Sequence, residues 1–305
     1  MAVSLAILAL IYWQIDVGRM IDVLQKSHVG WLLAGLAMVV PITVLTAERL
    51  RILTPLPAGL RLGDAVGLIL SASVLNMVLP SKMGDVAKSV FMKQHGLSGS
   101  LALALVILEK ACDMLSLLLW CTIGLAQLPR HGTLFWILGG SVLLGISGGI
   151  LLLSSPAPVA SLGRVLAAVG RTKWRARIGN LEENWGQMRE FVWNHPPRLA
   201  AVAGISLFLW FLHLGQIWMF TMALRSDVPF VANLGLAPLA ILAGLLPLTF
   251  AGVGTRDAAL ILFYRPYMDP ATGAALGLLC TSRYLMPALG GVPFLRRHLA
   301  EVWGK

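Results

Sequence analysis

Charged residues are scarce in this chain. Only 12% of its 305 residues are Asp, Glu, Lys or Arg, whereas an ordinary soluble domain has about 25%. Hydrophobic residues make up 57%, and the mean hydropathy is +0.80. A soluble domain of this composition would leave a large apolar surface in water, so the composition predicts an all-α polytopic membrane protein. It also excludes a disordered chain, which needs high charge and few aliphatic residues.

Cysteine is rare too, and three residues exclude a disulfide-rich secreted scaffold. Cys112, Cys121 and Cys280 all lie in apolar stretches, without the spacing of a zinc or redox motif. The sequence contains no GxSxG, HExxH, Walker A or GxGxxG motif, so no enzyme and no cofactor is predicted. The net charge of +10 comes in short basic blocks between apolar runs, which is typical of membrane orientation signals and not of nucleic-acid binding.

Long uncharged runs locate the membrane helices, because a crossing needs about 20 apolar residues. Two further apolar segments, 62–80 and 230–248, are short for a crossing and lead into Pro80 and Pro247. About six spans are predicted, the first of them rather short: 1–15, 27–47, 97–127, 133–153, 198–224 and 270–295.

Lys and Arg set the orientation, because short loops rich in them stay in the cytoplasm. The segment richest in these residues is 154–197. We expect it to be a cytoplasmic connector that lies on anionic lipid, or, equally, a solvated loop that only sets topology. Counting from it puts both chain termini in the cytoplasm, both flanks of 62–80 inside and both flanks of 230–248 outside. The two segments are therefore predicted to be re-entrant hairpins of opposite orientation, with ordinary kinked spans as the alternative.

The hairpins divide the chain into an N-terminal half, 1–153, and a C-terminal half, 198–305. Broken apolar segments in corresponding positions of two halves, with opposite topology, are the sequence sign of an inverted-repeat transporter. Backbone that is broken at membrane depth must line protein or a watery cavity. The breaks near Pro80 and Pro247 therefore indicate cavities.

Each break carries residues that suit an anionic headgroup. A helix that starts after a break presents free N–H groups and a positive dipole end, and glycine lets the backbone approach a ligand. Lys82 and Arg256 add one positive charge to each break. The alternative is that these residues only form ordinary turns at helix boundaries. For Asn76 we slightly favour a role in satisfying backbone groups that the break leaves without hydrogen bonds. The candidate residues are Asn76, Pro80, Lys82, Gly84 and Asp85 in the first break, and Gly252, Gly254, Arg256 and Asp257 in the second.

Ionised side chains within predicted spans are the sharpest feature. Glu109 and Asp113 are four residues apart and share a helix face, and Lys110 can pair with Asp113. Arg283 lies in the middle of the last span, and we hypothesise that it pairs with Glu109 or Asp113 across the two halves. Charges at this depth are costly and mark substrate pathways or relays. The alternative is an ion pair that locks two helices together.

Four other polar residues are given structural roles. Glu48 and Arg49 lie at a predicted helix end, where we expect them to be solvated at the membrane interface. His213 and Gln216 form a polar step in the fifth span, where we expect contacts between helices.

Both breaks resemble signatures of the lysylphosphatidylglycerol synthase transmembrane-region family. The run from Asn76 to Asp85 is similar to the family's Asn, Leu-Pro, basic, Gly and acid pattern, and Glu109-Lys110 stands where the family usually has Glu-Arg, before a later Asp. The run from Leu246 to Asp257 resembles Pro-x-x-x-Gly-Gly-Leu-Gly-x-Arg-Glu, with Ala251 in place of one Gly. The resemblance extends over nearly the whole chain.

The resemblance implies that the protein handles lipid. In members fused to an aminoacyl-transferase domain, this region is credited with flipping aminoacylated phosphatidylglycerol, and stand-alone relatives are linked to hopanoid and polyprenyl lipids. We therefore expect a flippase-like transporter of a membrane lipid in the bacterial cytoplasmic (inner) membrane, working by alternating access. The alternatives are a non-transporting accessory subunit of a lipid-modifying or glycosyl-transfer enzyme and an ion-coupled solute transporter. A homo-oligomer or a lipid-synthesising enzyme is a possible partner.

Overall fold

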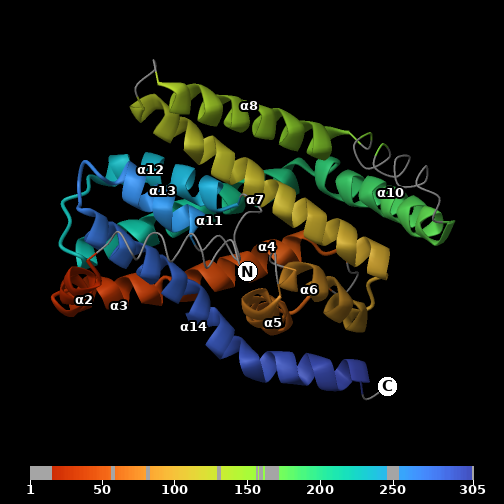
Figure 1. Ribbon diagram of the computed structural model, residues 1–305. Coiled ribbons are helices and arrows are strands. Elements are labelled where there is room, and N and C mark those ends of the chain that lie inside the picture. Colours follow the sequence, from red (N-terminus) through yellow and green to blue (C-terminus); the bar gives the residue numbers. More distant parts are fainter. Residues whose placement is uncertain are drawn as a thin grey trace.

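The described part of the chain is built from helices alone (Figure 1). The computed structural model describes residues 16–55, 59–79, 83–128, 132–155, 157, 161, 172–245 and 254–303. The predicted first span, 1–15, lies outside them. The helices are α2 (Val17–Gln25), α3 (Val29–Ala37), α4 (Val39–Leu53), α5 (Leu62–Val78), α6 (Gly84–Met92), η2 (Lys93–His95), α7 (Gly99–Gln127), α8 (Thr133–Ser154), α10 (Thr172–Trp193), α11 (Pro196–Ala223), α12 (Phe230–Gly244), α13 (Thr255–Phe263) and α14 (Pro270–Trp303).

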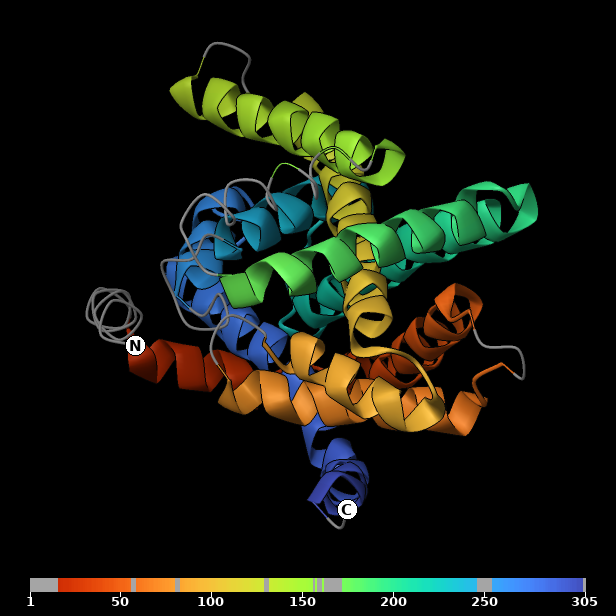
Figure 2. The ribbon, with the colours of Figure 1, turned by 90° about the vertical axis from the view of Figure 1, so that its right-hand side faces the viewer.

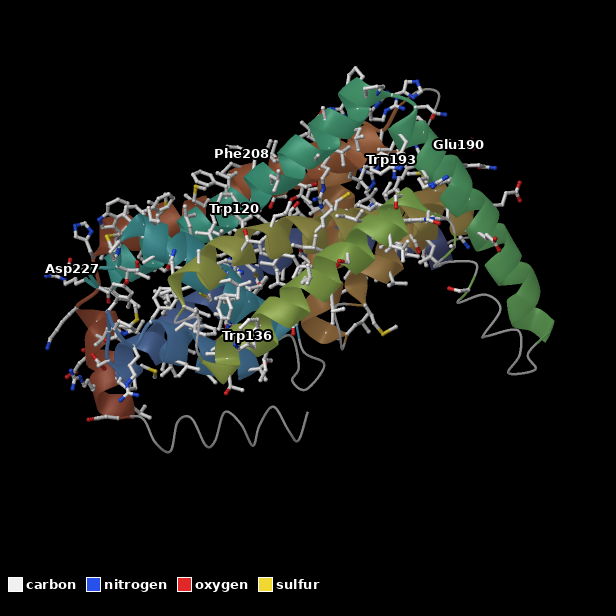
Figure 3. The ribbon with its side chains drawn as sticks, turned by 90° about the horizontal axis from the view of Figure 1, so that it is seen from above. Trp120, Trp136, Glu190, Trp193, Phe208 and Asp227 are labelled. Atoms are coloured by element: carbon white, nitrogen blue, oxygen red, sulfur yellow. The ribbon has the colours of Figure 1, made fainter. Side chains whose placement is uncertain are left out.

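Three helical segments among the described residues are long and apolar enough to cross a membrane. They are Val29–Leu53, which comprises α3 and α4, and the helices α8 and α11. Helices α7 and α14 are longer still, with 29 and 34 residues, but each carries charges in its middle. Glu190 and Asp227, which flank α11, lie at opposite ends of the molecule (Figure 3). The protein is therefore an integral membrane protein, as its composition predicts.

The first expected hairpin has different limbs from those predicted. The described part of segment 62–80 does not turn back on itself, because α5 continues without a break from Leu62 to Val78. The returning limb is α6, which lies alongside α5 (Figure 2). Its first residue, Gly84, is so close to α5 that a Cβ atom there would lie 2.5 Å from the backbone nitrogen of Asn76. Helix formation is cooperative, so one long limb keeps hydrogen bonds that two short limbs would lose.

The second hairpin follows the same plan. Helix α12 is continuous through Gly244, despite Pro238 in its interior, and α13 packs against it as the returning limb. Arg256 lies against Gly244 at one end of this pair. At the other end the Tyr264 hydroxyl donates a 2.8 Å hydrogen bond to Oδ1 of Asn233. The described part of segment 230–248 is thus one helical limb.

Each half packs one long helix on a helix of the other half. The long helix α7 of the first half packs on α12 of the second, and the long helix α14 of the second half packs on α5 of the first. Both crossings are close at a glycine: Gly124 of α7 faces the Gly235 carbonyl of α12, and Gly291 of α14 faces the Leu70 carbonyl of α5. Reciprocal contacts of this kind are what two related halves would make.

The glycine crossing gives a stability prediction. Gly124→Val is expected to destabilise the protein by about 1–3 kcal/mol, because the new side chain meets the backbone of α12. The matched control is Gly148→Val in α8, where a Cβ atom meets nothing within 4 Å. The measurement is thermal unfolding of both variants in detergent. Equal melting temperatures would contradict the close crossing.

The connector 154–197 contains the packed helix α10. Trp185, Met188 and Val192 of α10 are almost fully buried, and Arg189 donates a hydrogen bond to the Ser154 carbonyl at the end of α8. Helix α10 packs on α7 and α11. The described part of the connector is therefore attached to the helical body and is not a fully solvated loop.

Candidate functional site

A cavity of about 400 Å³ lies between helices of both halves. Helices α4, α5, α6 and α7 contribute to its wall from the first half, and α11 and α14 from the second. Part of the wall is apolar and part is charged. The apolar part includes Val39, Ile42, Ile69, Met77, Leu209, Trp210 and Pro287. The charged part consists of Arg49, Asp85, Glu109, Lys110, Asp113 and Arg283.

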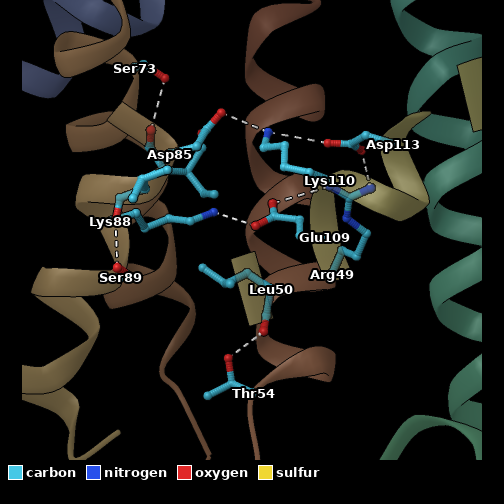
Figure 4. Close-up of polar contacts among 12 residues, drawn as sticks. Arg49, Leu50, Thr54, Ser73, Asp85, Lys88, Ser89, Glu109, Lys110 and Asp113 are labelled. Carbon is cyan, nitrogen blue, oxygen red and sulfur yellow. Dashed lines mark hydrogen bonds and ion pairs between the residues drawn. The ribbon is translucent and has the colours of Figure 1, made fainter. Parts of the chain in front are cut away.

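Glu109 is the centre of the buried ion pairs (Figure 4). Its Oε2 atom lies 2.5 Å from Nζ of Lys88 on α6. Its Oε1 atom lies 3.3 Å from Nη2 of Arg49 on α4. All three side chains are at most 2% exposed. A charge this deep is stable only when it is paired, so Glu109 joins three helices at one point.

The ion pairs continue from the buried Glu109 to the more exposed Lys110. Asp113 accepts a 2.5 Å hydrogen bond from Nη1 of Arg49. Lys110 lies 3.5 Å from Asp113 and 2.9 Å from Asp85 of α6, and its side chain is 45% exposed. The six residues form a chain of alternating charge: Asp85, Lys110, Asp113, Arg49, Glu109 and Lys88 (Figure 4).

Helical spacing explains how these charges meet. Glu109 and Asp113 are one turn apart on α7, and Asp85 and Lys88 are one turn apart on α6, so each pair faces one side of its helix. Arg49 reaches both acids of α7 from α4 because its guanidinium has several N–H donors in a fixed fork. It also donates a 3.0 Å hydrogen bond to the Ser206 hydroxyl of α11, which ties the network to the second half.

Arg283 of α14 also lines the cavity, and it forms no ion pair with an acid among the described residues. The hypothesis that it pairs with Glu109 or Asp113 is wrong, because Arg49 and Lys88 already occupy those carboxylates. Its Nη2 atom donates a 2.8 Å hydrogen bond to the Tyr284 hydroxyl. Its Nε and Nη1 atoms are buried and have no hydrogen-bond partner among the described residues.

The comparison with protein families decides what kind of membrane protein this is. The model of the lysylphosphatidylglycerol synthase TM region matches residues 1–291. The chain belongs to this family. No curated protein matches it, and no solved structure matches it. Membership in the lysylphosphatidylglycerol synthase transmembrane-region family indicates a function related to membrane lipid, in a region that is transmembrane and not a catalytic domain.

This family member has two site residues that sequence reasoning missed. Arg49 was expected at the solvated interface, yet it is 1% exposed and holds both acids of α7. Its neighbour Glu48 does lie at the surface, paired with Arg51. Lys88 was not among the candidate residues, yet it is fully buried against Glu109. The available signal was charge balance, since α7 has two acids and one lysine and so needed bases from elsewhere.

The first break contributes to the cavity only in part. Asn76 and Asp85 line the cavity, as the hypothesis of a binding site requires. Gly84 does not face it as an approach point for a ligand, because its missing side chain makes room for α5. Pro80 and Lys82 lie outside the described residues.

The second break is a packed corner of this family member. Gly254 has a φ angle of 109°, which glycine tolerates best, and its N–H donates to Asp257. Arg256 lies 2.6 Å from Asp257 and also donates to the Gly277 carbonyl and the Thr281 hydroxyl of α14. Neither Arg256 nor Asp257 is among the residues that line the cavity. These contacts give the pair a structural role, because it ties α13 to α14. Gly252 lies outside the described residues.

The polar step in α11 also reaches the cavity. Gln216 donates a 2.8 Å hydrogen bond to the Gly35 carbonyl of α3, so the expected helix contact is confirmed for it. His213 and Gln216 both line the cavity wall.

Proposed function

We propose that this protein is a flippase-like transporter that moves a membrane lipid between leaflets by alternating access. The substrate classes compatible with the family are an anionic or aminoacylated phospholipid and a polyprenyl- or hopanoid-type lipid. The observation that carries the proposal is the cavity of about 400 Å³ between the two halves, with charges on one part of its wall and apolar side chains on another.

The cavity suits a lipid headgroup better than a whole lipid. Its volume is near the lower end of the range for small-molecule sites, about 300–1,000 Å³. The acyl or prenyl tails would remain in the bilayer, where exposed apolar residues of α4 and α5 such as Val40, Val44 and Val78 provide a lipid-compatible surface. In the proposed mechanism two related units, α7 with α12 and α14 with α5, rock against each other around the headgroup, and the reciprocal packing of these helix pairs supports it.

The setting we propose is the bacterial cytoplasmic membrane, with both termini in the cytoplasm. The basic connector and the C-terminal pair Arg296 and Arg297 support this orientation through the positive-inside rule. Anionic lipid at the connector is part of the same proposal.

The test is leaflet exchange of fluorescent lipids in proteoliposomes. Wild-type protein is expected to expose inner-leaflet probe to an external quencher, and Arg283→Ala to slow this by about tenfold or more, since about 1.4 kcal/mol of added barrier suffices for that change. The matched control is Arg297→Ala, because Arg297 lies on the same helix with a side chain 72% exposed. No exchange with any of several headgroups would favour the accessory-subunit alternative. If Arg283→Ala exchanged lipid at the wild-type rate, the cavity would not lie on the transport pathway.

A further inference from the structure

The charges around the cavity do not cancel. Among the described residues, its wall and the adjoining Lys88 contain four bases and three acids, which leaves one positive charge. All 14 acidic residues of the chain lie in its described part, so no acid outside that part can neutralise the excess. Each of the three acids has a basic partner within 3.5 Å. The excess charge therefore belongs to Arg283.

Arg283 is also the base whose donors are unused. Only 5% of the residue is exposed, and it lines the cavity. Two of its nitrogens, Nε and Nη1, are buried without a partner in the described structure. The third nitrogen, Nη2, donates a hydrogen bond to the Tyr284 hydroxyl, and the centroid of the Tyr284 ring lies 4.9 Å from the guanidinium carbon. These two contacts hold the side chain in place. A fixed guanidinium with free donors matches the geometry of a phosphate.

We infer that the cavity selects a lipid with a phosphate monoanion and no ammonium group in its head, and that Arg283 binds the phosphate. This inference rests on the proposed function and narrows its substrate class. One phosphodiester charge balances the excess positive charge and supplies acceptors for the N–H donors of Nε and Nη1. The apolar wall formed by residues such as Ile42, Ile69 and Leu209 favours a lipid over a soluble phosphate ester.

An ammonium group finds no vacant carboxylate here. Asp113 accepts from Arg49 and lies near Lys110, Asp85 pairs with Lys110, and Glu109 is enclosed by Lys88 and Arg49. An aminoacylated or ethanolamine headgroup would have to break one of these pairs to bind its amine. A buried pair that loses one partner leaves an uncompensated charge, so this exchange is unfavourable.

The experiment measures binding by the full chain in detergent. A fluorescent phosphatidylglycerol is displaced by unlabelled phosphatidylglycerol, phosphatidylethanolamine, lysyl-phosphatidylglycerol or glycerol 3-phosphate. Unlabelled phosphatidylglycerol is expected to bind about tenfold more tightly than the other three, a difference of about 1.4 kcal/mol. Arg283→Gln is expected to weaken the binding of phosphatidylglycerol by about the same factor and to abolish the preference for it over the other three ligands. Arg297→Gln, the matched change outside the cavity, is expected to keep it.

A second variant separates binding from folding. Arg283→Lys retains the positive charge but not the planar, forked set of donors. It should therefore weaken phosphatidylglycerol binding less than Arg283→Gln does and keep the preference over lysyl-phosphatidylglycerol. Arg283→Gln loses the contacts with Tyr284 but no ion pair, so it should lower the melting temperature far less than Glu109→Gln, which leaves buried charges without a counter-ion. A loss as large as that of Glu109→Gln would show that Arg283 has an acidic partner and would overturn the inference.

Two results would overturn the selectivity. One is equal binding of lysyl-phosphatidylglycerol or phosphatidylethanolamine by the wild type, and the other is an unchanged preference in Arg283→Gln. Glycerol 3-phosphate binding as tightly as the lipid would assign the site to a soluble phosphate ester. Failure of the proposed function looks different: the binding preference would be intact, but proteoliposomes would show no leaflet exchange. Leaflet exchange without a headgroup preference would overturn the inference about selectivity but would support the proposed function.

Discussion

Glu109→Gln is expected to destabilise the protein by about 3–5 kcal/mol, because the change leaves buried positive charges without their counter-ion. Glu109 bonds Lys88 at 2.5 Å and Arg49 at 3.3 Å, and none of the three side chains is more than 2% exposed. Arg49 retains Asp113 in the variant, but Lys88 keeps no second acidic partner in the described part of the chain. Unfolding in a denaturing detergent titration would measure the loss.

The partner variant makes this prediction specific. Lys88→Met, added to Glu109→Gln, should recover much of the loss, because a buried pair replaced on both sides leaves no uncompensated charge. The matched control is Glu301→Gln, which removes an exposed pair with Arg297 and should cost less than about 1 kcal/mol. A double variant no more stable than Glu109→Gln would show that Lys88 is not the group stranded by the change.

This result also affects how transport is assayed. As a charge within a predicted span, Glu109 is a natural choice for a transport-deficient variant. The structure makes Glu109 the junction of α4, α6 and α7, so its removal is expected to reduce the amount of folded protein. Arg283, which has no ion pair to lose, is the better residue for testing transport.

The sequence predicted the centre of the site but only part of its surroundings. Glu109, Lys110 and Asp113 stand out because charges are rare in an apolar run, and the structure places all three on the cavity. Arg49 was missed because a base at a helix end is usually solvated. Whether it turns inwards depends on α4 packing beside α7, which neighbouring sequence positions do not determine. Arg256 was expected to bind an anionic headgroup, but it pairs with an acid, and that acid is simply the next residue, Asp257.

The fold shows the same division. Apolar runs and basic loops predicted an all-helical membrane protein, and two short apolar segments that lead into prolines predicted two corresponding breaks. They did not show which helix forms the second limb of each hairpin. The limbs α6 and α13 are nine residues each and carry buried polar groups, so a search for apolar runs passes over them. Their positions depend on close contacts such as Gly84 with α5, which are visible only after folding.

Filling the cavity should stop transport without unfolding the protein. Ser73 of α5 lines the cavity and is only partly buried, and its hydroxyl donates to the Ile69 carbonyl of its own helix. Ser73→Trp places an indole in a space of about 400 Å³ and so competes with any headgroup. Leaflet exchange in proteoliposomes is expected to fall by about tenfold or more, which needs a barrier increase of only about 1.4 kcal/mol.

The matched control is Ser141→Trp in α8. Ser141 makes the same kind of hydrogen bond, to the Ile137 carbonyl, but lies on an exposed helix face away from the cavity wall. This variant should exchange lipid at the wild-type rate, with the same yield and melting temperature as Ser73→Trp. Unimpaired exchange by Ser73→Trp would mean that lipid moves outside this cavity, for example along the surface groove of another helix pair. Because the Ser73 change removes no charge and no bond between helices, its effect separates the headgroup path from the ion-pair network that holds α4, α6 and α7 together.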